Sequence, residues 1–251
     1  MSDLLLLDCG NSRIKWQWRR AGSVQQQGIW SDGLVLPAAW STMRPAVIWG
    51  SSVRAVADQK VIEQTLHRIW DVPIVWATST AQLAGVVNGY ERPELLGVDR
   101  WLTLLACHAR FADPCVIIDA GTAVTVDFLG MQGCHAGGYI VPGMTLMHGS
   151  LCRGTARLRE PWETPQNIQP ARQTKDAINR GLLLLMAGLM HEVRQQALDL
   201  WPGKTVQWVL TGGGISMLNL VLDQLPGGVH TVPDLVLDGL YLWGVGCQTP
   251  A

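Results

Sequence analysis

Two stretches decide the fold, LLLLDCGNSRIKWQW at 4–18 and VIIDAGTAVTVDFL at 116–129. In both, a short apolar run ends in Asp-x-Gly and a small polar residue, and a second run then leads back. Apolar runs joined by a glycine-containing turn are typical of antiparallel strands. Because the two copies lie roughly half the chain apart, they indicate a duplicated domain.

Further strands and helices are predicted after each copy. Around the first copy, strands are predicted within 4–29 as a three-strand meander and at 46–50 and 73–76, with helices at 56–69 and 99–111. Around the second, strands are predicted at 115–118, 124–129, 134–141 and 206–210, with helices at 144–151, 176–200, 215–225 and 235–246. This order predicts an α/β protein in which each domain has a mixed sheet flanked by helices.

The pattern restarts after Asp113-Pro114, which places a domain boundary there. We therefore predict an N-terminal domain at 1–112 and a C-terminal domain at 113–251, each carrying one copy of the motif. Ligands of two-domain α/β proteins commonly bind in the cleft between the halves. We expect the functional site in such an interdomain cleft.

Composition limits the classes of function. The chain has 251 residues, of which 48% are hydrophobic and 16% charged, so a globular protein is expected. The formal net charge is -1 and Lys and Arg form no block, which argues against a nucleic-acid partner. An anionic ligand must then be held by a few placed side chains and backbone amides.

The cysteines and histidines show no metal-binding pattern. The six cysteines form no CxxC pair and the six histidines no HExxH motif, so a structural zinc or iron–sulfur site is not expected. The apolar run at 182–190 is far shorter than the roughly 18 residues that cross a bilayer. We expect a cytoplasmic protein that does not bind membranes.

The first motif, at 8–15, has the chemistry of a phosphate-binding turn. Gly10 permits a turn whose backbone N–H groups converge on an oxyanion, and Asn11 and Ser12 add short donors. Asp8, at a strand end, is suited to hold Mg²⁺, through water because this ion keeps much of its hydration shell. The alternative is an ordinary hairpin turn.

The second motif predicts a second phosphate-binding turn. Gly121 and Thr122 follow Asp119 as Gly10 and Asn11 follow Asp8, so the two turns together suit the β- and γ-phosphates of a nucleotide. The alternative is a second hairpin with a capping Asp. Asp127, further along the returning strand, is predicted to face solvent.

A third motif, Gly97-Val98-Asp99-Arg100, opens a predicted helix. Asp99 could accept the proton of an attacking hydroxyl, and Arg100 could bind a polar or anionic part of the substrate. The alternative is a helix cap. The glycine-rich segments at 137–143 and 211–214 allow close backbone approach to a ligand, but neither matches GxxxxGKS/T or a complete GxGxxG.

Taken together, the motifs resemble those of type III pantothenate kinases, a bacterial branch of the superfamily of acetate and sugar kinases, heat-shock cognate proteins and actin. The matching segments occur in family order over almost the whole chain. They are DCGNSRIK at 8–15, GVDR at 97–100, DAGTAVT at 119–125, GGYIVPG at 137–143, TKDAINRG at 174–181, TGGG at 211–214 and DLVLDGL at 234–240.

The resemblance implies two duplicated actin-like, ribonuclease H-like domains and an ATP-dependent kinase. It implies phosphorylation of the primary hydroxyl of pantothenate to 4'-phosphopantothenate, the first step of coenzyme A synthesis. It also implies Mg²⁺ with ATP, a monovalent cation (K⁺ or NH₄⁺), and a homodimer with pantothenate near the subunit contact.

The resemblance also implies roles for individual residues. Asp99 would be the proton acceptor, and Asp119 would bind the monovalent cation. The ATP site would comprise Asp8, Cys9, Gly10, Asn11, Ser12, Arg13, Ile14, Lys15 and Thr122. The pantothenate site would comprise Tyr90, Gly97, Val98, Asp99, Arg100 and Thr174. Ser12 stands where the family often has Thr, which retains the hydroxyl.

Two other functions fit the same fold. The family also resembles Bvg accessory factors, described as helpers of transcription, although a regulator without turnover has no chemical need for Asp99 and two phosphate turns. A sugar kinase or a dehydratase activator is the other alternative. Sugar kinases are usually much longer, and activators need cysteines placed to share an iron–sulfur cluster.

Overall fold

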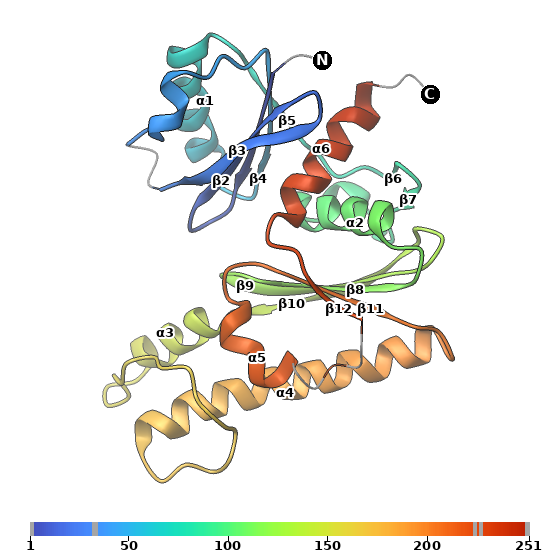
Figure 1. Cartoon of the computed structure of the whole chain (residues 1–251). Coiled ribbons are helices and arrows are strands. Elements are labelled where there is room, and N and C mark those ends of the chain that lie inside the picture. Colours follow the sequence, from blue (N-terminus) through green and yellow to red (C-terminus); the bar gives the residue numbers. More distant parts are fainter. Residues whose placement is uncertain (1–2, 32–34, 223–224, 226–227, 249–251) are drawn as a thin grey trace. The chain divides into compact units, whose positions relative to one another are not determined.

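The computed structural model describes residues 3–31, 35–222, 225 and 228–248 (Figure 1). The described residues form two compact units, one within 1–110, 132–134 and 234–251 and the other within 111–131 and 135–233. The predicted division assigned everything after residue 112 to the second domain. In the structure the last helix lies in the first unit instead, for reasons of packing given below.

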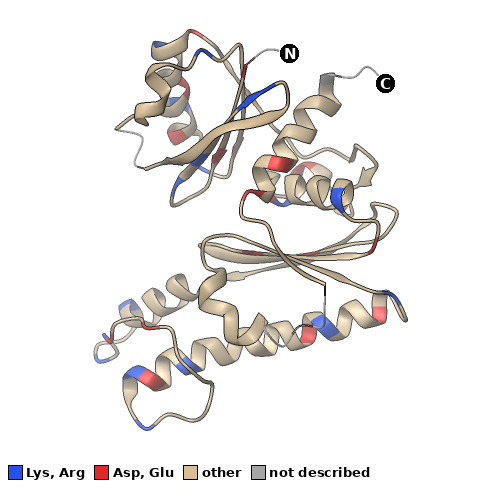
Figure 2. Ribbon diagram, in the orientation of Figure 1, with Lys and Arg blue, Asp and Glu red and all other residues tan. Residues whose placement is uncertain are grey.

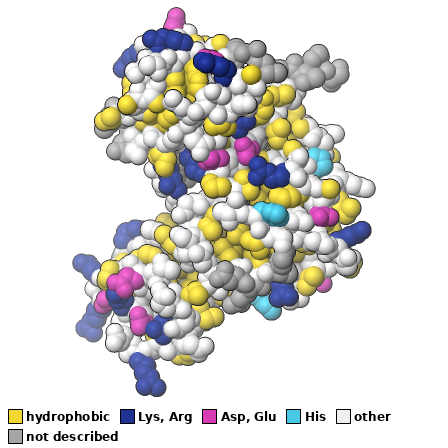
Figure 3. All heavy atoms as spheres, in the orientation of Figure 1, with side chains coloured by type: hydrophobic (Ala, Val, Ile, Leu, Met, Phe, Trp, Pro, Cys, Tyr) yellow, Lys and Arg dark blue, Asp and Glu magenta, His cyan; other side chains and the backbone are white. Residues whose placement is uncertain are grey.

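Charged side chains are spread along the ribbon of both units (Figure 2). On the face drawn in Figure 3, acidic and basic side chains are intermixed, and no patch of one sign covers it. Among the described residues, no helix is long and apolar enough to cross a membrane.

The first unit is built on a five-stranded mixed sheet. Its strands are β1 (Leu4–Cys9), β2 (Ile14–Arg20), β3 (Ser23–Trp30), β4 (Val47–Ser52) and β5 (Ile74–Trp76), in the order β3-β2-β1-β4-β5. β1, β2 and β3 form an antiparallel meander, and β4 and β5 continue the sheet parallel to β1. The helices of this unit are α1 (Val56–Trp70), α2 (Val98–Arg110) and α6 (Leu235–Gln248), and β6 (Gln82–Leu83) pairs with β7 (Val86–Val87) in a small ribbon.

One face of β1 packs in the core of the first unit, and the other carries Asp8. Leu5, Leu7 and Cys9 lie in a core that includes Ile62 and Leu66 of α1. Because side chains alternate along a strand, Asp8 lies on the opposite face from Cys9. Tryptophans fill much of this core: Trp40 contacts Trp16, Trp30 and Trp70 at centroid distances of 5.8, 5.1 and 5.2 Å.

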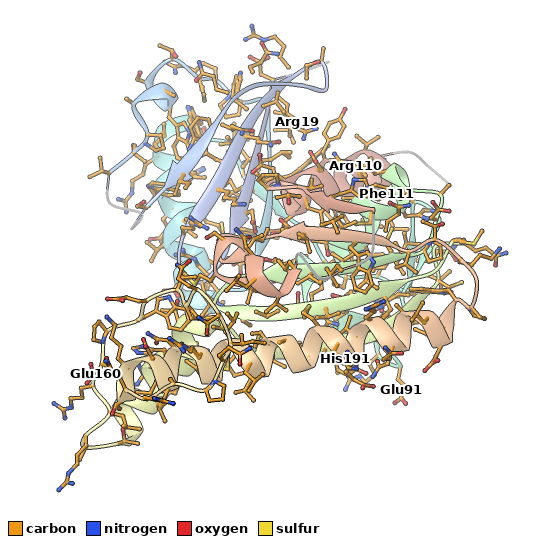
Figure 4. The ribbon with its side chains drawn as sticks, turned by 60° about the horizontal axis from the view of Figure 1, so that its bottom comes forward. Arg19, Glu91, Arg110, Phe111, Glu160 and His191 are labelled. Atoms are coloured by element: carbon orange, nitrogen blue, oxygen red, sulfur yellow. The ribbon has the colours of Figure 1, made fainter. Side chains whose placement is uncertain are left out.

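α6 is bound to the first unit by close packing and by an ion-pair network. Gly239 lies so near the main chain of α2 that a Cβ there would collide with the carbonyl of Leu102, and a Cβ at Gly244 would collide with the ring of Trp49. Buried Arg19 donates to Asp238 Oδ1 at 2.9 Å, and Arg110 reaches Asp238 Oδ2 at 3.3 Å. Figure 4 labels both arginines. These contacts explain why the last helix completes the first unit.

Adding one methyl group at Gly239 should therefore be costly. We expect Gly239→Ala to lower the free energy of unfolding by about 2–3 kcal/mol, because the backbone of α2 cannot move aside as a flexible side chain can. Urea unfolding measures this loss. Gly188→Ala is the control, since nothing lies within 4 Å of a Cβ at this α4 position and alanine should add about 0.5–1 kcal/mol. Equal losses in both variants would contradict the packing argument.

The second unit repeats the strand order of the first. Its strands are β8 (Cys115–Ala120), β9 (Ala123–Leu129), β10 (His135–Pro142), β11 (Gln207–Thr211) and β12 (Val229–Thr231), in the order β10-β9-β8-β11-β12. β8, β9 and β10 form the antiparallel meander, and β11 and β12 are parallel to β8. The predicted duplication is confirmed by this topology.

Helices of the second unit cover its sheet. They are α3 (Met144–Gly154), α4 (Thr174–Leu200) and the short α5 (Asn219–Leu222), which follows a 3-10 turn at Ile215–Leu218. α4 runs along one face of the sheet (Figure 1), and its Leu183, Met190 and Val193 pack in one core with Val116 and Ile118 of β8. The predicted helix at 215–225 is shorter in the structure and starts as the 3-10 turn; 223–224 lie outside the described residues.

The prediction for Asp127 was wrong. Its side chain is buried, and Asp127 Oδ1 lies 2.9 Å from Nε2 of His135, which is buried as well. Both residues belong to the antiparallel pair β9 and β10, so a neighbouring strand supplies the partner that burial of a carboxylate requires.

Candidate active site

The turn between β1 and β2 offers main-chain groups and exposed side chains to a ligand. Asn11, Ser12 and Arg13 are exposed at its tip. Cys9 and Ile14, by contrast, are fully buried in the core beneath it, so only their main-chain groups are available to a nucleotide. The segment predicted to bind phosphate thus has an exposed face and an anchored face.

The end of β4 and the residues that follow it hold this turn through three hydrogen bonds. Ser51 Oγ donates to Asp8 Oδ1 at 3.1 Å, the N–H of Val53 donates to the carbonyl of Cys9 at 3.3 Å, and Arg54 Nε donates to the carbonyl of Gly10 at 2.7 Å. Parallel pairing of β1 with β4, which sets Ser51 beside Asp8, creates the arrangement. The sequence analysis did not include these supporting residues; the signal was the polar SSVR that follows an apolar strand at 51–54.

Asp8 is electrostatically coupled to Asp99. Burial, followed by the negative charge of Asp99 and more weakly that of Asp234, raises the pKa of Asp8 from 3.8 to about 6, although Lys15 and the bond from Ser51 act in the opposite direction. Lys15 Nζ lies 3.8 Å from Asp234 Oδ1. The first unit therefore brings the predicted phosphate turn and the predicted proton acceptor together.

The thiol of Cys9 is held in its protonated form. Burial, and then the charge of Asp8, raise the pKa of its thiol to about 12, with Arg54 acting in the opposite direction. The protonated thiol is the inert form of cysteine. Cys9 therefore serves as an apolar core residue below the turn.

The start of α2 gathers most of the predicted pantothenate residues. Asp99 Oδ1 accepts a hydrogen bond from the N–H of Arg100 at 2.8 Å, so Asp99 also acts partly as the helix cap named as the alternative. A Cβ at Gly97 would lie 2.7 Å from that same oxygen, which explains the glycine. Arg100 is buried and donates to the hydroxyl of Tyr90 at 2.5 Å, with its guanidinium 5.4 Å from the centre of the Tyr90 ring.

The raised pKa of Asp8 predicts a pH dependence of nucleotide binding. If Asp8 holds Mg²⁺ as its sequence motif predicts, its carboxyl must be ionised to do so, and affinity for Mg²⁺·ATP should rise with pH through about 6 and be constant above pH 7. In Asp99→Asn the repelling charge is gone, and the midpoint should move to lower pH. Calorimetric titration between pH 5 and 8 measures both midpoints, and an unshifted midpoint in the variant would contradict the coupling.

The second unit brings three glycine-containing turns together at one edge of its sheet. Gly212, at φ 95°, lies so close to Asp119 and the carbonyl of Ala120 that a Cβ would collide with both. The N–H of Gly214 donates to the carbonyl of Ala120 at 2.7 Å. Likewise the N–H of Gly143 donates to the carbonyl of Thr122 at 2.9 Å. This packing of main chain on main chain holds the three turns close to Asp119.

The predicted site residues are divided between the units. The turn at 8–15, Tyr90 and the segment 97–100 lie in the first unit, and Asp119, Thr122 and Thr174 in the second. Thr122 and Thr174 are exposed, Thr174 as the first residue of α4. No group of three or more His, Cys, Asp or Glu side chains suited to a metal occurs within the described residues.

Comparison with known proteins identifies the family. The sequence profile described as type III pantothenate kinase matches residues 4–196. This chain belongs to the type III pantothenate kinase family. A type III pantothenate kinase of Ectopseudomonas mendocina is 38% identical over 245 residues, which cover 94% of this chain and 97% of that protein. The chain is accordingly a kinase, and the resemblance drawn from its motifs is confirmed.

Two solved structures share this fold. A conserved Campylobacter jejuni protein assigned to the Baf family of transcriptional activators gives a TM-score of 0.59 at 18% identity, covering 95% of this chain and 96% of that one. A Sinorhizobium meliloti protein assigned as a 2-dehydro-3-deoxygalactonokinase gives 0.58 at 13% identity, covering 98% of this chain and 100% of that one. With the repeated strand order, these likenesses confirm the predicted actin-like fold class of the pantothenate kinase family.

Proposed function

We propose that this chain transfers the γ-phosphoryl group of ATP to the primary hydroxyl of pantothenate and releases 4'-phosphopantothenate, the first intermediate of coenzyme A synthesis. The observation that carries the proposal is the match to type III pantothenate kinases over most of the chain, and the effect of the Asp99 charge on the pKa of Asp8 agrees with it. One of these carboxylates belongs to a turn suited to phosphate and the other to a helix start suited to an alcohol.

In this proposal, residues 8–15 bind the triphosphate and Thr122 of the second turn contacts it. The backbone N–H groups at Gly10 and the side chains of Asn11 and Ser12 donate to phosphate oxygens. Lys15 supplies positive charge. Asp8 offers carboxylate oxygens, the donors that Mg²⁺ prefers, and the ion when bound neutralises charge on the phosphates.

Asp99 is proposed as the proton acceptor. The hydroxyl oxygen of pantothenate bonds to the γ-phosphorus, the bond from that phosphorus to the oxygen of ADP breaks, and the hydroxyl proton passes to Asp99. A carboxylate suffices as base because the loose transition state of phosphoryl transfer permits late proton loss. Arg100 and Tyr90, already bonded to each other, orient pantothenate, and Gly97, Val98 and Thr174 complete its site.

Mass-spectrometric detection of the product tests the proposal. Purified protein with Mg²⁺·ATP, K⁺ and pantothenate should form 4'-phosphopantothenate and ADP in equal amounts, and no product should form without ATP. If pantothenate stays unmodified although calorimetry shows ATP binding, the kinase assignment fails for this chain.

We further propose that Asp119 binds the monovalent cation, K⁺ or NH₄⁺. Its carboxylate lies beside the main-chain carbonyl of Ala120 and the turn at Gly212, and oxygen ligands of this kind suit a hard cation. Asp119→Asn should raise the half-saturating K⁺ concentration by about tenfold, because one full charge of the site is lost. Initial rates across a KCl series at constant ionic strength measure this. A K⁺ curve identical to that of the unmodified protein would remove the assignment.

The proposal extends to assembly and location. We propose a homodimer with pantothenate near the subunit contact, which sedimentation equilibrium tests through its mass. We also propose a cytoplasmic location, where ATP is supplied, and cell fractionation tests it.

A further inference from the structure

Arg54 lies beside the phosphate turn without belonging to any of the matching motifs. It follows β4, just before α1, and is partly buried. Its Nε donates to the carbonyl of Gly10 at 2.7 Å, and its own N–H donates to Ser52 Oγ at 3.2 Å. The backbone and the side chain of Arg54 are therefore both held in place at the turn.

Most donors of the Arg54 guanidinium remain available to a ligand. Across 3–31, 35–222, 225 and 228–248, the guanidinium has one protein partner, the Gly10 carbonyl, and it uses Nε alone. Its positive charge acts on the turn, since it favours the ionised form of the Cys9 thiol, although burial outweighs this effect. An arginine presents five donors in a rigid planar fork, and the outer edge of that fork matches two phosphate oxygens.

The negative charge around the turn favours an additional cation there. Three carboxylates, Asp8, Asp99 and Asp234, act on this region. Lys15 is paired with Asp234 and Arg100 is bonded to Tyr90, so each of these cations already serves an internal partner. A nucleoside triphosphate brings several more negative charges to the same place, and repulsion between like charges must be offset for it to bind.

We propose that Arg54 is a further phosphate-binding residue of this kinase: Nε fixes the Gly10 carbonyl, and the two terminal amino groups bind oxygens of the phosphate chain of the nucleotide. The inference rests on the proposed function in one respect, that the nucleotide phosphates lie at the turn 8–12. It adds a contact from the segment after β4, which none of the family motifs includes.

Calorimetric titration without pantothenate tests the contact. Three ligands are used: Mg²⁺·AMP-PNP, Mg²⁺·ADP and AMP. Each is titrated into the unmodified full-length protein and into the variants Arg54→Gln, Arg54→Lys and Arg68→Gln. In Arg54→Gln the affinity for AMP-PNP should fall about 10- to 100-fold, the effect of losing hydrogen bonds to a charged group. The loss should shrink from AMP-PNP to ADP to AMP. Arg54→Lys, which keeps the charge but loses the fork, should be intermediate, and the exposed Arg68 of α1 should have no effect.

The outcomes separate a phosphate contact from support of the turn alone. An equal loss for all three nucleotides, or an unchanged affinity for AMP-PNP, overturns the inference. Circular dichroism checks folding, and if Arg54→Gln does not fold, Arg54→Lys gives the same ranking of nucleotides. Guanidinium ions should restore part of the AMP-PNP affinity of Arg54→Gln, whereas equal NaCl should not. If the unmodified protein forms no phosphopantothenate, but the loss of affinity caused by Arg54→Gln still shrinks from AMP-PNP to ADP to AMP, the proposed function fails and this contact stands.

Discussion

Asp99→Asn should lower kcat for phosphopantothenate formation by about 10²- to 10⁴-fold, the usual contribution of a positioned general base. The amide keeps the shape of the carboxylate but cannot accept the proton. ATP affinity at pH 7.5 should stay within about twofold, because Asp8 is ionised there with or without its neighbour. Steady-state rates and calorimetric titration of both substrates measure the two effects separately.

Glu94→Gln provides the matched control for Asp99→Asn. Glu94 is exposed and pairs with Arg92 on the surface shortly before α2, so the same change from acid to amide should leave kcat unaltered. Parallel losses of ATP affinity and kcat in Asp99→Asn would show that Asp99 binds or supports the nucleotide and does not accept the proton.

Asp8→Asn should lower turnover and raise the stability of the fold. Turnover with Mg²⁺·ATP should fall by about 10³-fold or more, since the proposed metal ligand loses its charge. The free energy of unfolding at pH 7.5 should rise by about 2–3 kcal/mol. The folded protein raises the pKa of Asp8 from 3.8 to about 6, and each unit of that shift costs about 1.4 kcal/mol when the group is ionised.

The sign of the stability effect follows from linkage. Below pH 3.8 the carboxyl is protonated in both the folded and the unfolded state, so the variant should gain nothing there. The gain should grow between pH 3.8 and about 6 and stay constant above, as urea unfolding across this range would show. Asp58→Asn in the first turn of α1 is the control and should lose a few tenths of a kcal/mol through the helix dipole. If the difference in free energy of unfolding between Asp8→Asn and the unmodified protein did not change with pH, ionised Asp8 would not destabilise the fold.

Local sequence patterns sufficed for the strands that carry the site. The apolar runs before Asp8 and Asp119 are long and end in glycine turns, and both were found as β1 and β8. β12 was missed because Val-His-Thr contains no apolar run. It is a strand because it pairs in parallel with β11, which lies outside its local sequence pattern. Asp127 was misplaced because its buried partner, His135, lies on another strand.

The candidate site could be predicted from the sequence only in part. The carboxylates Asp8 and Asp99 each stand in a recognisable motif, and the structure brings them into one electrostatic environment. Ser51 and Arg54 carry no such motif. They reach the turn because β4 pairs in parallel with β1, and no local pattern reveals this pairing between distant parts of the chain.

The position of α6 has a consequence for synthesis of the chain. A ribosome delivers β1 to α2 first and the helix that packs on Trp49 and Leu102 last, with the whole second sheet translated in between. The second unit is nearly contiguous in sequence, so it can fold before α6, which the first unit needs, has been translated. Until α6 has been translated, the apolar surface on which that helix packs is accessible to chaperones and to other nascent chains.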